Sequence, residues 1–103
     1  MSVTVVRYTT TPEAADQNQA LIEDVFAGLH ASQPEGLRYL SLRLEDGVSF
    51  VHFAIQTDDG PGPLPQVEAF KRFQEGIRER AESPPVVAEL REVGSFRLLD
   101  AAR

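Results

Sequence analysis

Residues 37–56 read LRYLSLRLEDGVSFVHFAIQ, and they decide the fold because they predict one β-hairpin. Leu37 to Leu44 and Val48 to Gln56 are rich in residues that favour strands. Asp46-Gly47 between them suits a two-residue type I′ turn, in which both central positions need a positive φ. That turn would pair Glu45 with Val48, and it would thereby set the register of every later pair along the hairpin.

The predicted register gives the hairpin two faces of different chemistry, because side chains alternate along a strand. One face is mainly apolar and is expected to form the core against the helices; its cross-strand pairs are Leu44/Ser49, Leu42/Val51, Leu40/Phe53 and Arg38/Ile55. The other face is mixed; it carries Tyr39, Arg43, Phe50 and His52. We expect the helices to leave this mixed face uncovered.

Length and composition predict one domain over residues 1–103, with 42% hydrophobic and 25% charged residues. The chain has no apolar run near the ~20 residues of a membrane helix and no secretory signal, so a cytoplasmic location is expected by default. The net charge of −6 argues against nucleic-acid binding. The absence of cysteine excludes disulfides and thiolate nucleophiles, and two distant histidines with no organised carboxylate cluster predict no metal site.

The other elements follow from periodicity and from capping and breaking residues. A first strand is predicted over Ser2–Thr9, then a helix from Thr11-Pro12 to about Ser32. Residues 57–65 are predicted to form a loop, and a second helix is predicted from Pro65 to Glu82. The last strand is predicted over Glu92–Leu99, while Val86–Leu90 is compatible with a short helical turn or an irregular edge segment.

The resulting order βαββαβ predicts an α+β, ferredoxin-like fold, a four-stranded antiparallel sheet with both helices on one side. The opposite side of the sheet would face water, and a large, partly aromatic surface is rarely left there. We therefore predict a homodimer in which two sheets pack through the face carrying Tyr39, Arg43, Phe50 and His52.

The chain resembles the antibiotic biosynthesis monooxygenase superfamily over nearly its whole length. The resemblance rests on the element order and on three stretches, which are VTVVRY at 3–8 with Thr11-Pro12, EAFKRF at 68–73 and VGSF at 93–96. It implies a dimeric α/β barrel, built from two ferredoxin-like subunits. It further implies that the chain is a cofactor-independent monooxygenase acting on aromatic, polyketide-like molecules, although some members degrade haem and many have no known activity.

The chain also departs from the family pattern. Many relatives carry Glu-x-Trp at the end of the third strand, where this chain has Ile55-Gln56-Thr57 and no tryptophan. Many place a histidine where this chain has Phe73, and the haem-degrading branch uses a first-strand asparagine that is missing here. These departures argue against haem binding, and the resemblance itself implies no other cofactor.

Two amides, Asn18 and Gln74, fall within the apolar stripes of the two predicted helices, so both are expected to point toward the sheet. A buried amide needs hydrogen-bond partners. Those partners could be nearby backbone or loops. The functional alternative is a pocket for a small apolar or aromatic ligand. Its predicted lining is Asn18, Phe26, Phe53, Phe70, Phe73 and Gln74.

His52 faces Ser41 across the predicted hairpin, and Tyr39 and Arg43 lie two positions along. A histidine beside hydroxyls can act as a general base, so His52 is a candidate catalytic residue. Asn18, the inward-pointing amide of the first helix, is the other candidate. The alternative for His52 is a hydrogen-bonded residue between two packed sheets.

Three functions stay open: an oxygenase, a non-catalytic protein that binds a small ligand, and a structural homodimer. An enclosed cavity against Asn18 and Gln74 would favour the first two. Tight filling of that space by phenylalanines would favour the third.

Overall fold

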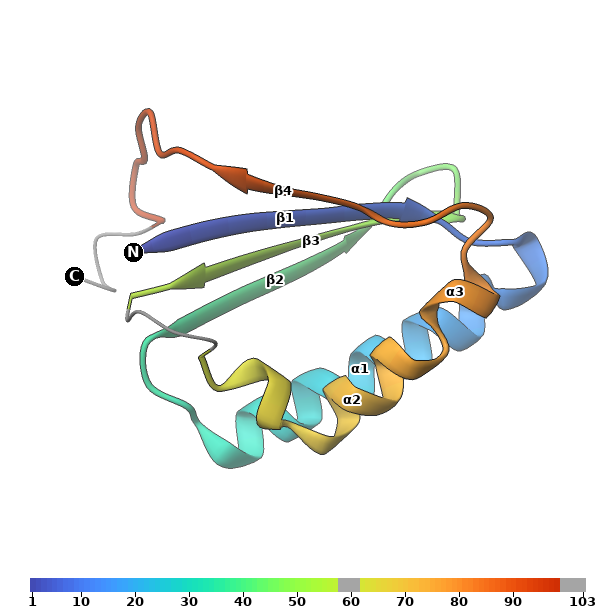
Figure 1. Cartoon of the computed structure of the whole chain (residues 1–103), viewed down its shortest axis with the longest axis horizontal. Coiled ribbons are helices and arrows are strands. Elements are labelled where there is room, and N and C mark those ends of the chain that lie inside the picture. The colour runs from blue at the N-terminus through green and yellow to red at the C-terminus, as the bar shows by residue number, and fades with distance from the viewer. Residues whose placement is uncertain (58–61, 99–103) are drawn as a thin grey trace.

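The computed structural model describes residues 1–57 and 62–98. Four strands form one antiparallel sheet in the order β2-β3-β1-β4, and the helices all lie on one side of it (Figure 1). The strands are β1 (Ser2–Thr9), β2 (Leu37–Arg43), β3 (Ser49–Gln56) and β4 (Val86–Leu90). This order confirms the ferredoxin-like prediction, and β1 has its predicted bounds. That residues 1–103 form a single domain stays a prediction.

The helical layer contains two main helices and three short turns. A short 3-10 helix η1 (Pro12–Ala14) leads into α1 (Ala15–Ser32), close to the prediction. The second predicted helix is broken into η2 (Leu64–Gln66), α2 (Glu68–Glu75) and α3 (Ile77–Arg80). The prediction of one helix from Pro65 to Glu82 was therefore wrong. The break between α2 and α3 falls at Gly76, where an added Cβ would lie 2.5 Å from Arg80 Nη1.

The hairpin has the predicted register, because Arg43 pairs with Phe50, Ser41 with His52 and Leu40 with Phe53. Its turn differs from the prediction. Among the turn residues only Gly47 has a positive φ, of 78°, and its N–H donates to the Leu44 carbonyl at 3.0 Å. The last closing bond runs from the Leu44 N–H to the Ser49 carbonyl at 2.9 Å, so the loop has four residues, 45–48. Lengthening a hairpin loop from two residues to four leaves the register unchanged.

The assignment of the two sheet faces was wrong. The face predicted to be uncovered packs against the helices, with Phe50 and His52 buried and Tyr39 half-buried. The face predicted to form the core is the open one, with Leu40 51% and Leu42 47% exposed. Consequently Tyr39, Arg43, Phe50 and His52 cannot carry a sheet-to-sheet dimer contact.

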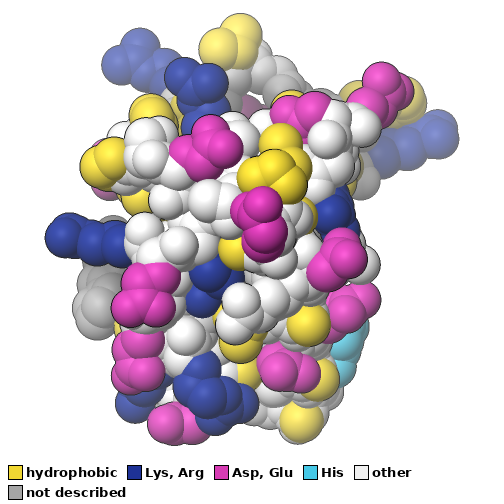
Figure 2. All heavy atoms as spheres, turned by 90° about the vertical axis from the view of Figure 1, so that its right-hand side faces the viewer, with side chains coloured by type: hydrophobic (Ala, Val, Ile, Leu, Met, Phe, Trp, Pro, Cys, Tyr) yellow, Lys and Arg dark blue, Asp and Glu magenta, His cyan; other side chains and the backbone are white. Residues whose placement is uncertain are grey.

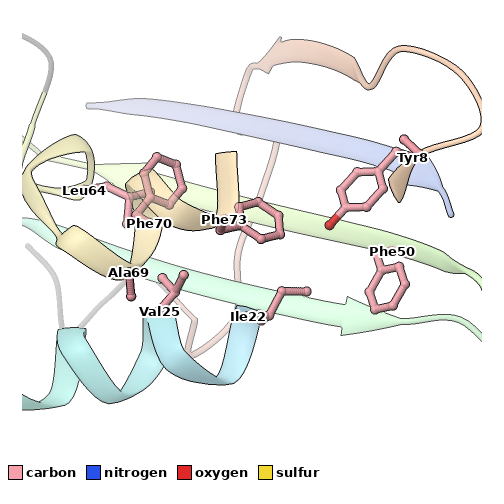
Figure 3. Close-up of a cluster of buried hydrophobic side chains, with 9 residues drawn as sticks. Tyr8, Ile22, Val25, Phe50, Leu64, Ala69, Phe70 and Phe73 are labelled. Carbon is pink, nitrogen blue, oxygen red and sulfur yellow. The ribbon is translucent and has the colours of Figure 1, made fainter. Parts of the chain in front are cut away.

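The hydrophobic core lies between the sheet and the two main helices (Figure 3). Tyr8 of β1 and Phe50 of β3 stack with ring centroids 5.7 Å apart, and Phe73 of α2 lies tilted against Tyr8 at 6.5 Å. The α1 side contributes Ile22 and Val25. Aromatic rings fill this space well because they bury large areas in preferred stacked or edge-on contacts.

The C-terminal part also differs from the prediction. The fourth strand is Val86–Leu90, which the sequence left undecided, and the described part of the predicted strand 92–99 has no regular structure. Leu99 lies outside the described residues. In the 91–98 segment Val93 is 97% and Phe96 77% exposed.

The end of the molecule seen in Figure 2 carries acidic and basic side chains interspersed. Such mixing is typical of a solvated surface and gives no extended basic patch on this side. Across 1–57 and 62–98, none of the helices is long and apolar enough to cross a membrane. The cytoplasmic location stays a prediction.

Candidate functional site

A chain of polar side chains runs through the core from α3 to β2. Arg80 Nε donates to Asn18 Oδ1 at 2.9 Å, and Asn18 Nδ2 donates to the Tyr8 hydroxyl at 2.9 Å. The Tyr8 hydroxyl lies 2.8 Å from His52 Nε2, and on the other side of the ring His52 Nδ1 lies 2.6 Å from Ser41 Oγ. The Tyr39 hydroxyl lies 3.2 Å from the same nitrogen. We call Arg80, Asn18, Tyr8, His52, Ser41 and Tyr39 the polar chain.

Secondary structure places the members of this chain opposite one another. His52 and Ser41 are directly paired across β3 and β2, and Val6 on β1 pairs with His52, so Tyr8 lies two positions further along the same face. Asn18 is on α1, within the stripe that faces the sheet, and it is completely buried. Arg80 is at the end of α3 and reaches inward past the break at Gly76.

Aromatic rings enclose His52. The rings of Tyr8 and Tyr39 stack against it with centroids at 5.5 and 6.0 Å, and Phe73 meets it edge-on at 5.4 Å. Phe26 covers the outer side of Tyr39 with a stacked contact at 5.3 Å. His52 is only 3% exposed as a result.

Burial keeps the ring groups of the chain uncharged at neutral pH. It lowers the pKa of His52 to about 4, because the imidazolium would lose its hydration. It raises the pKa of Tyr39 to about 12, and it raises the pKa of Tyr8 further, an effect that the Asn18 hydrogen bond only partly offsets. Among the members of the polar chain, Arg80 is therefore the one with a formal charge.

Arg80 is an unusual member because it is 5% exposed and no carboxylate of the described residues is in ion-pair contact with it. Within 1–57 and 62–98 the ion pairs are Arg43–Asp16 and Lys71–Glu68. Neutral groups hold its guanidinium instead. Nη2 donates to the Phe73 carbonyl at 2.6 Å, and the guanidinium carbon lies 5.1 Å from the centroid of the Phe73 ring. Burial lowers the pKa of Arg80 but leaves it a cation.

A small hollow adjoins the outer end of the polar chain. It has a volume of about 170 Å³ at the β2 edge, and its lining is Phe26, Leu29, His30, Gln33, Pro34, Leu37 and Tyr39. A larger open groove of about 850 Å³ runs between α1 and the η2–α2 segment, and Asp24, Gly28, Val67 and Arg72 are among the residues that line it. Neither of these two hollows touches Asn18.

The structure joins the two predicted catalytic residues through an intermediary. Asn18 and His52 both bond to the Tyr8 hydroxyl, and His52 contacts Ser41 as its predicted pairing implied. Tyr8, Tyr39 and Arg80 were missed as site residues. Strand alternation predicts which residues of β1 share a face with Tyr8. Asking which of the two faces meets Asn18 on the helix would have identified Tyr8 as a site residue.

The predicted ligand-lining residues are only partly brought together. Phe70 and Phe73 lie in the core and Phe26 lines the hollow beside Tyr39. Phe53 lies on the opposite face of the sheet, because it alternates with the buried His52. Gln74 is exposed on α2. The expected pocket between Asn18 and Gln74 is therefore not formed, and aromatic rings fill the space beside Asn18.

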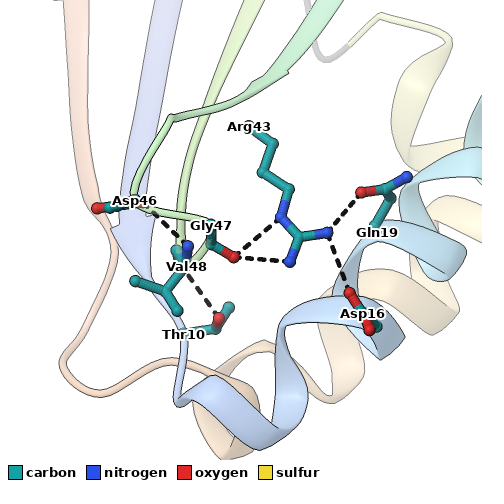
Figure 4. Close-up of polar contacts among 7 residues, drawn as sticks. All are labelled: Thr10, Asp16, Gln19, Arg43, Asp46, Gly47 and Val48. Atoms are coloured by element: carbon teal, nitrogen blue, oxygen red, sulfur yellow. Dashed lines mark hydrogen bonds and ion pairs between the residues drawn. The ribbon is translucent and has the colours of Figure 1, made fainter.

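A second polar cluster ties the hairpin tip to α1 (Figure 4). Arg43 donates through Nε and Nη2 to the Gly47 carbonyl at 2.9 and 2.7 Å, and through Nη1 to Gln19 at 2.6 Å and Asp16 at 3.2 Å. Asp16 and Gln19 are exposed, so this cluster lies at the surface, apart from the polar chain. No group of three side chains able to hold a metal occurs in the part of the chain that the structure describes.

In comparisons with known proteins, no family model and no curated protein matches the chain. Several solved structures do match. Rv0793 from Mycobacterium tuberculosis is 18% identical at a TM-score of 0.72, covering 91% of this chain and 96% of its own. A Nitrosomonas europaea protein provisionally named an antibiotic biosynthesis monooxygenase is 11% identical at a TM-score of 0.76, covering 91% and 100%.

A third match is a point mutant of SnoaB, a cofactor-independent oxygenase from Streptomyces nogalater. It is 18% identical at a TM-score of 0.69, covering 93% of this chain and 96% of its own. At such identities the likeness shows the fold alone. The chain has the fold of the antibiotic biosynthesis monooxygenase-like proteins, which confirms the resemblance at that level.

Proposed function

We propose that this chain is a cofactor-independent oxygenase for small hydroxylated aromatic molecules. The observation that carries the proposal is the polar chain, in which a neutral, fully enclosed His52 connects the interior cation Arg80 to two hydroxyls at the β2 edge. Perturbed titratable groups joined in such an array are common at functional sites. The shared fold with SnoaB supports the same assignment.

In this proposal the ring of the substrate lies in the hollow beside Phe26 and Tyr39, and its ionised hydroxyl accepts hydrogen bonds from the outer end of the polar chain. A hollow of about 170 Å³ has room for a single aromatic ring. The hydrogen bonds stabilise the phenolate or enolate, whose carbon supplies the electrons that reduce dioxygen. A carbon–oxygen bond then forms, and the peroxide takes up one proton from solvent, in place of the one that the substrate hydroxyl lost, to give a hydroperoxide on a carbon that still bears hydrogen. The O–O bond then breaks as that carbon loses its hydrogen as a proton, and the departing hydroxide combines with this proton to give water and leave a carbonyl group.

The experiment is a dioxygen-uptake assay over a panel of one-ring and two-ring hydroxylated aromatics. We expect His52→Ala to lower the rate by about 10²-fold or more on any substrate that the wild type oxidises, as is common when a positioned acid–base or hydrogen-bonding group is lost. Gln74→Ala is the matched control, because Gln74 is exposed on α2 and should leave the rate unchanged. No uptake across the panel, or equal rates in both variants, would remove the proposal.

A second function, that of a structural homodimer, is favoured by a different observation. The space between α1, α2 and the sheet is filled by the rings of Tyr8, Phe50 and Phe73, and the fully buried Asn18 has its partners within the protein. If the polar chain serves only to satisfy buried groups, the wild type will fail the uptake assay and will still dimerise.

For either function we propose that two copies associate through the open sheet face. Three rows of paired residues cross this face. They are Ala88–Val5–Phe53–Leu40, Val86–Arg7–Val51–Leu42 and Leu90–Val3–Ile55–Arg38. Ten of these twelve residues are apolar. The face spans all four strands, and Leu40 and Leu42 on it are about half exposed. Single proteins rarely leave a large contiguous apolar surface in water.

A second copy is the occupant that the chemistry of this face favours. An aliphatic sheet face is complementary to another of the same kind, and a two-fold axis lets one patch serve both partners. The segment 91–98 follows β4 and reaches β2, where Arg38 Nη1 donates to the Leu98 carbonyl at 3.0 Å. Its exposed Val93 and Phe96 would add apolar area at this end of the face. The homodimer predicted from the sequence is kept, but its interface moves to the opposite face.

A further inference from the structure

Arg80 sets the direction of the hydrogen bonds at the inner end of the polar chain. A guanidinium only donates, so the Asn18 atom that faces Arg80 must be the carbonyl oxygen. The Asn18 NH₂ group is then turned toward Tyr8 and donates to its hydroxyl oxygen. The orientation of this buried amide is therefore decided by Arg80 and not by its other neighbour.

His52 is the next member of the polar chain beyond Tyr8. Since the Tyr8 oxygen already accepts from Asn18, its own hydrogen is available to His52 Nε2, 2.8 Å away. Among the described contacts of the Tyr8 hydroxyl, Nε2 is the one acceptor for that hydrogen, so we assign the ring hydrogen of the neutral imidazole to Nδ1. Nδ1–H donates to Ser41 Oγ at 2.6 Å, with the Tyr39 oxygen as a weaker second acceptor at 3.2 Å.

Beyond the histidine, the two hydroxyls continue the sequence. Ser41 and Tyr39 lie on the same face of β2, and the oxygens of both are within hydrogen-bond distance of His52 Nδ1. Because Nδ1–H donates to these oxygens, the hydrogens of the two hydroxyls are left for acceptors outside the polar chain. Tyr39 lines the hollow at the β2 edge. The outer end of the polar chain is thus a donor.

We propose that Arg80 is a positioning residue which holds His52 in the Nδ1–H form, so that the site offers hydroxyl donors to an anionic oxygen of its ligand. The ligand class, a phenolate or enolate, rests on the function proposed above. The control of the histidine by Arg80 does not, since it follows from donor and acceptor chemistry within this chain.

Two further features of the surroundings of Arg80 are consistent with a charged positioning residue. Gly76 leaves room for the guanidinium, because a Cβ there would meet Arg80 Nη1 at 2.5 Å. The described residues supply no carboxylate in ion-pair contact to neutralise it. A cation at the inner end of a run of aligned hydrogen bonds favours negative charge at the outer end.

The test is the ¹⁵N NMR signature of the imidazole in protein labelled at histidine. In the wild type we expect the hydrogen of His52 on Nδ1. In Asn18→Asp the new carboxylate accepts from both Arg80 and Tyr8, so the Tyr8 oxygen turns to accept from His52, and the hydrogen should move to Nε2. Arg80→Met should mix the two forms, because the amide is then free to rotate. Arg78→Met, an exposed neighbour on α3, is the control and should match the wild type.

Asn18→Asp keeps the test decisive if Arg80→Met fails to fold, because it preserves the guanidinium and gives it an ion-pair partner. A wild-type hydrogen on Nε2, or an unchanged signature in Asn18→Asp, would overturn the role of Arg80.

The ligand class is tested separately with 4-nitrophenol, whose anion is followed by its absorbance. We expect wild-type protein to lower the apparent pKa of the bound phenol and Asn18→Asp to abolish that shift. Binding of the neutral form alone would overturn the preference for an anionic oxygen, and absence of dioxygen uptake would overturn only the oxygenase proposal.

Discussion

Individual residues in this core act through the groups they satisfy. Asn18 is a polar residue in an apolar helix stripe, and both polar atoms of its amide are hydrogen-bonded, the oxygen to Arg80 and the nitrogen to Tyr8. Across the described residues no buried side-chain nitrogen or oxygen lacks a hydrogen-bond partner. Because an unpaired buried polar group costs roughly 1–3 kcal/mol, removing any one member of the chain exposes the others to that cost.

The buried histidine should make stability depend on pH. The unfolded chain protonates His52 near its ordinary value of 6.5, whereas the folded protein protonates it only at about 4. Between these values the unfolded state binds more protons, so the free energy of unfolding should fall as pH drops, by roughly 3 kcal/mol in total. Urea unfolding at pH 7 and pH 4.5 measures this loss.

His52→Asn should be less stable at neutral pH but should lose less stability on acidification than the wild type. His30→Gln changes an exposed histidine and should keep the wild-type pH dependence. Parallel curves for the wild type and His52→Asn would contradict the buried, neutral state of His52.

Two elements differ from what sequence periodicity predicted: the second helix is broken beside the Arg80 side chain, and the hairpin loop is longer than two residues. The helix expected from 65 to 82 is interrupted where Gly76 admits the Arg80 guanidinium. The hairpin kept its register although its loop has four residues, with Asp46 accepting from the Val48 and Ser49 N–H groups at 2.9 and 2.8 Å. The Ser49 hydroxyl bond is the main reason that the pKa of Asp46 lies below its usual value.

Gly47 should be the conformationally demanding position of this hairpin. It has φ +78° and no heavy atom within 4 Å of an added Cβ, so the cost of Gly47→Ala is one of backbone conformation alone. We expect a loss of about 1 kcal/mol in the free energy of unfolding. Gly94→Ala is the matched control, because Gly94 has equal space and no positive φ, and it should change stability by less than about 0.5 kcal/mol. Equal effects in chemical unfolding would refute the argument.

For the whole molecule, the decisive feature is that the sheet has one covered and one open face. The helices bury the face with the polar chain, and the aliphatic face with its exposed leucines stays available to a partner. A second sheet on this face would bring the apolar rows out of water without disturbing the polar chain on the other side.

A charge on the open face should therefore separate the subunits. Leu42→Glu places a carboxylate beside the apolar Val51 and Leu40 at the proposed interface, where it would lose its hydration. We expect light scattering after size-exclusion chromatography to give twice the 11.4 kDa chain mass for the wild type and a single chain for Leu42→Glu. Gln74→Glu adds the same charge on exposed α2 and should stay dimeric. A monomeric wild type at high concentration would exclude this dimer.

Sequence reasoning alone gave the order of elements, the hairpin register and the inward direction of Asn18, while it misplaced the fourth strand. These follow from local rules, namely alternation along strands, helical periodicity and the glycine-containing turn, and each rule uses only neighbours along the chain. It could not decide which sheet face meets the helices, because both faces carry large apolar side chains. Only the tertiary structure decided that, since the polar atoms of Tyr8, Asn18, His52 and Arg80 come from four separate elements and satisfy one another only when packed together.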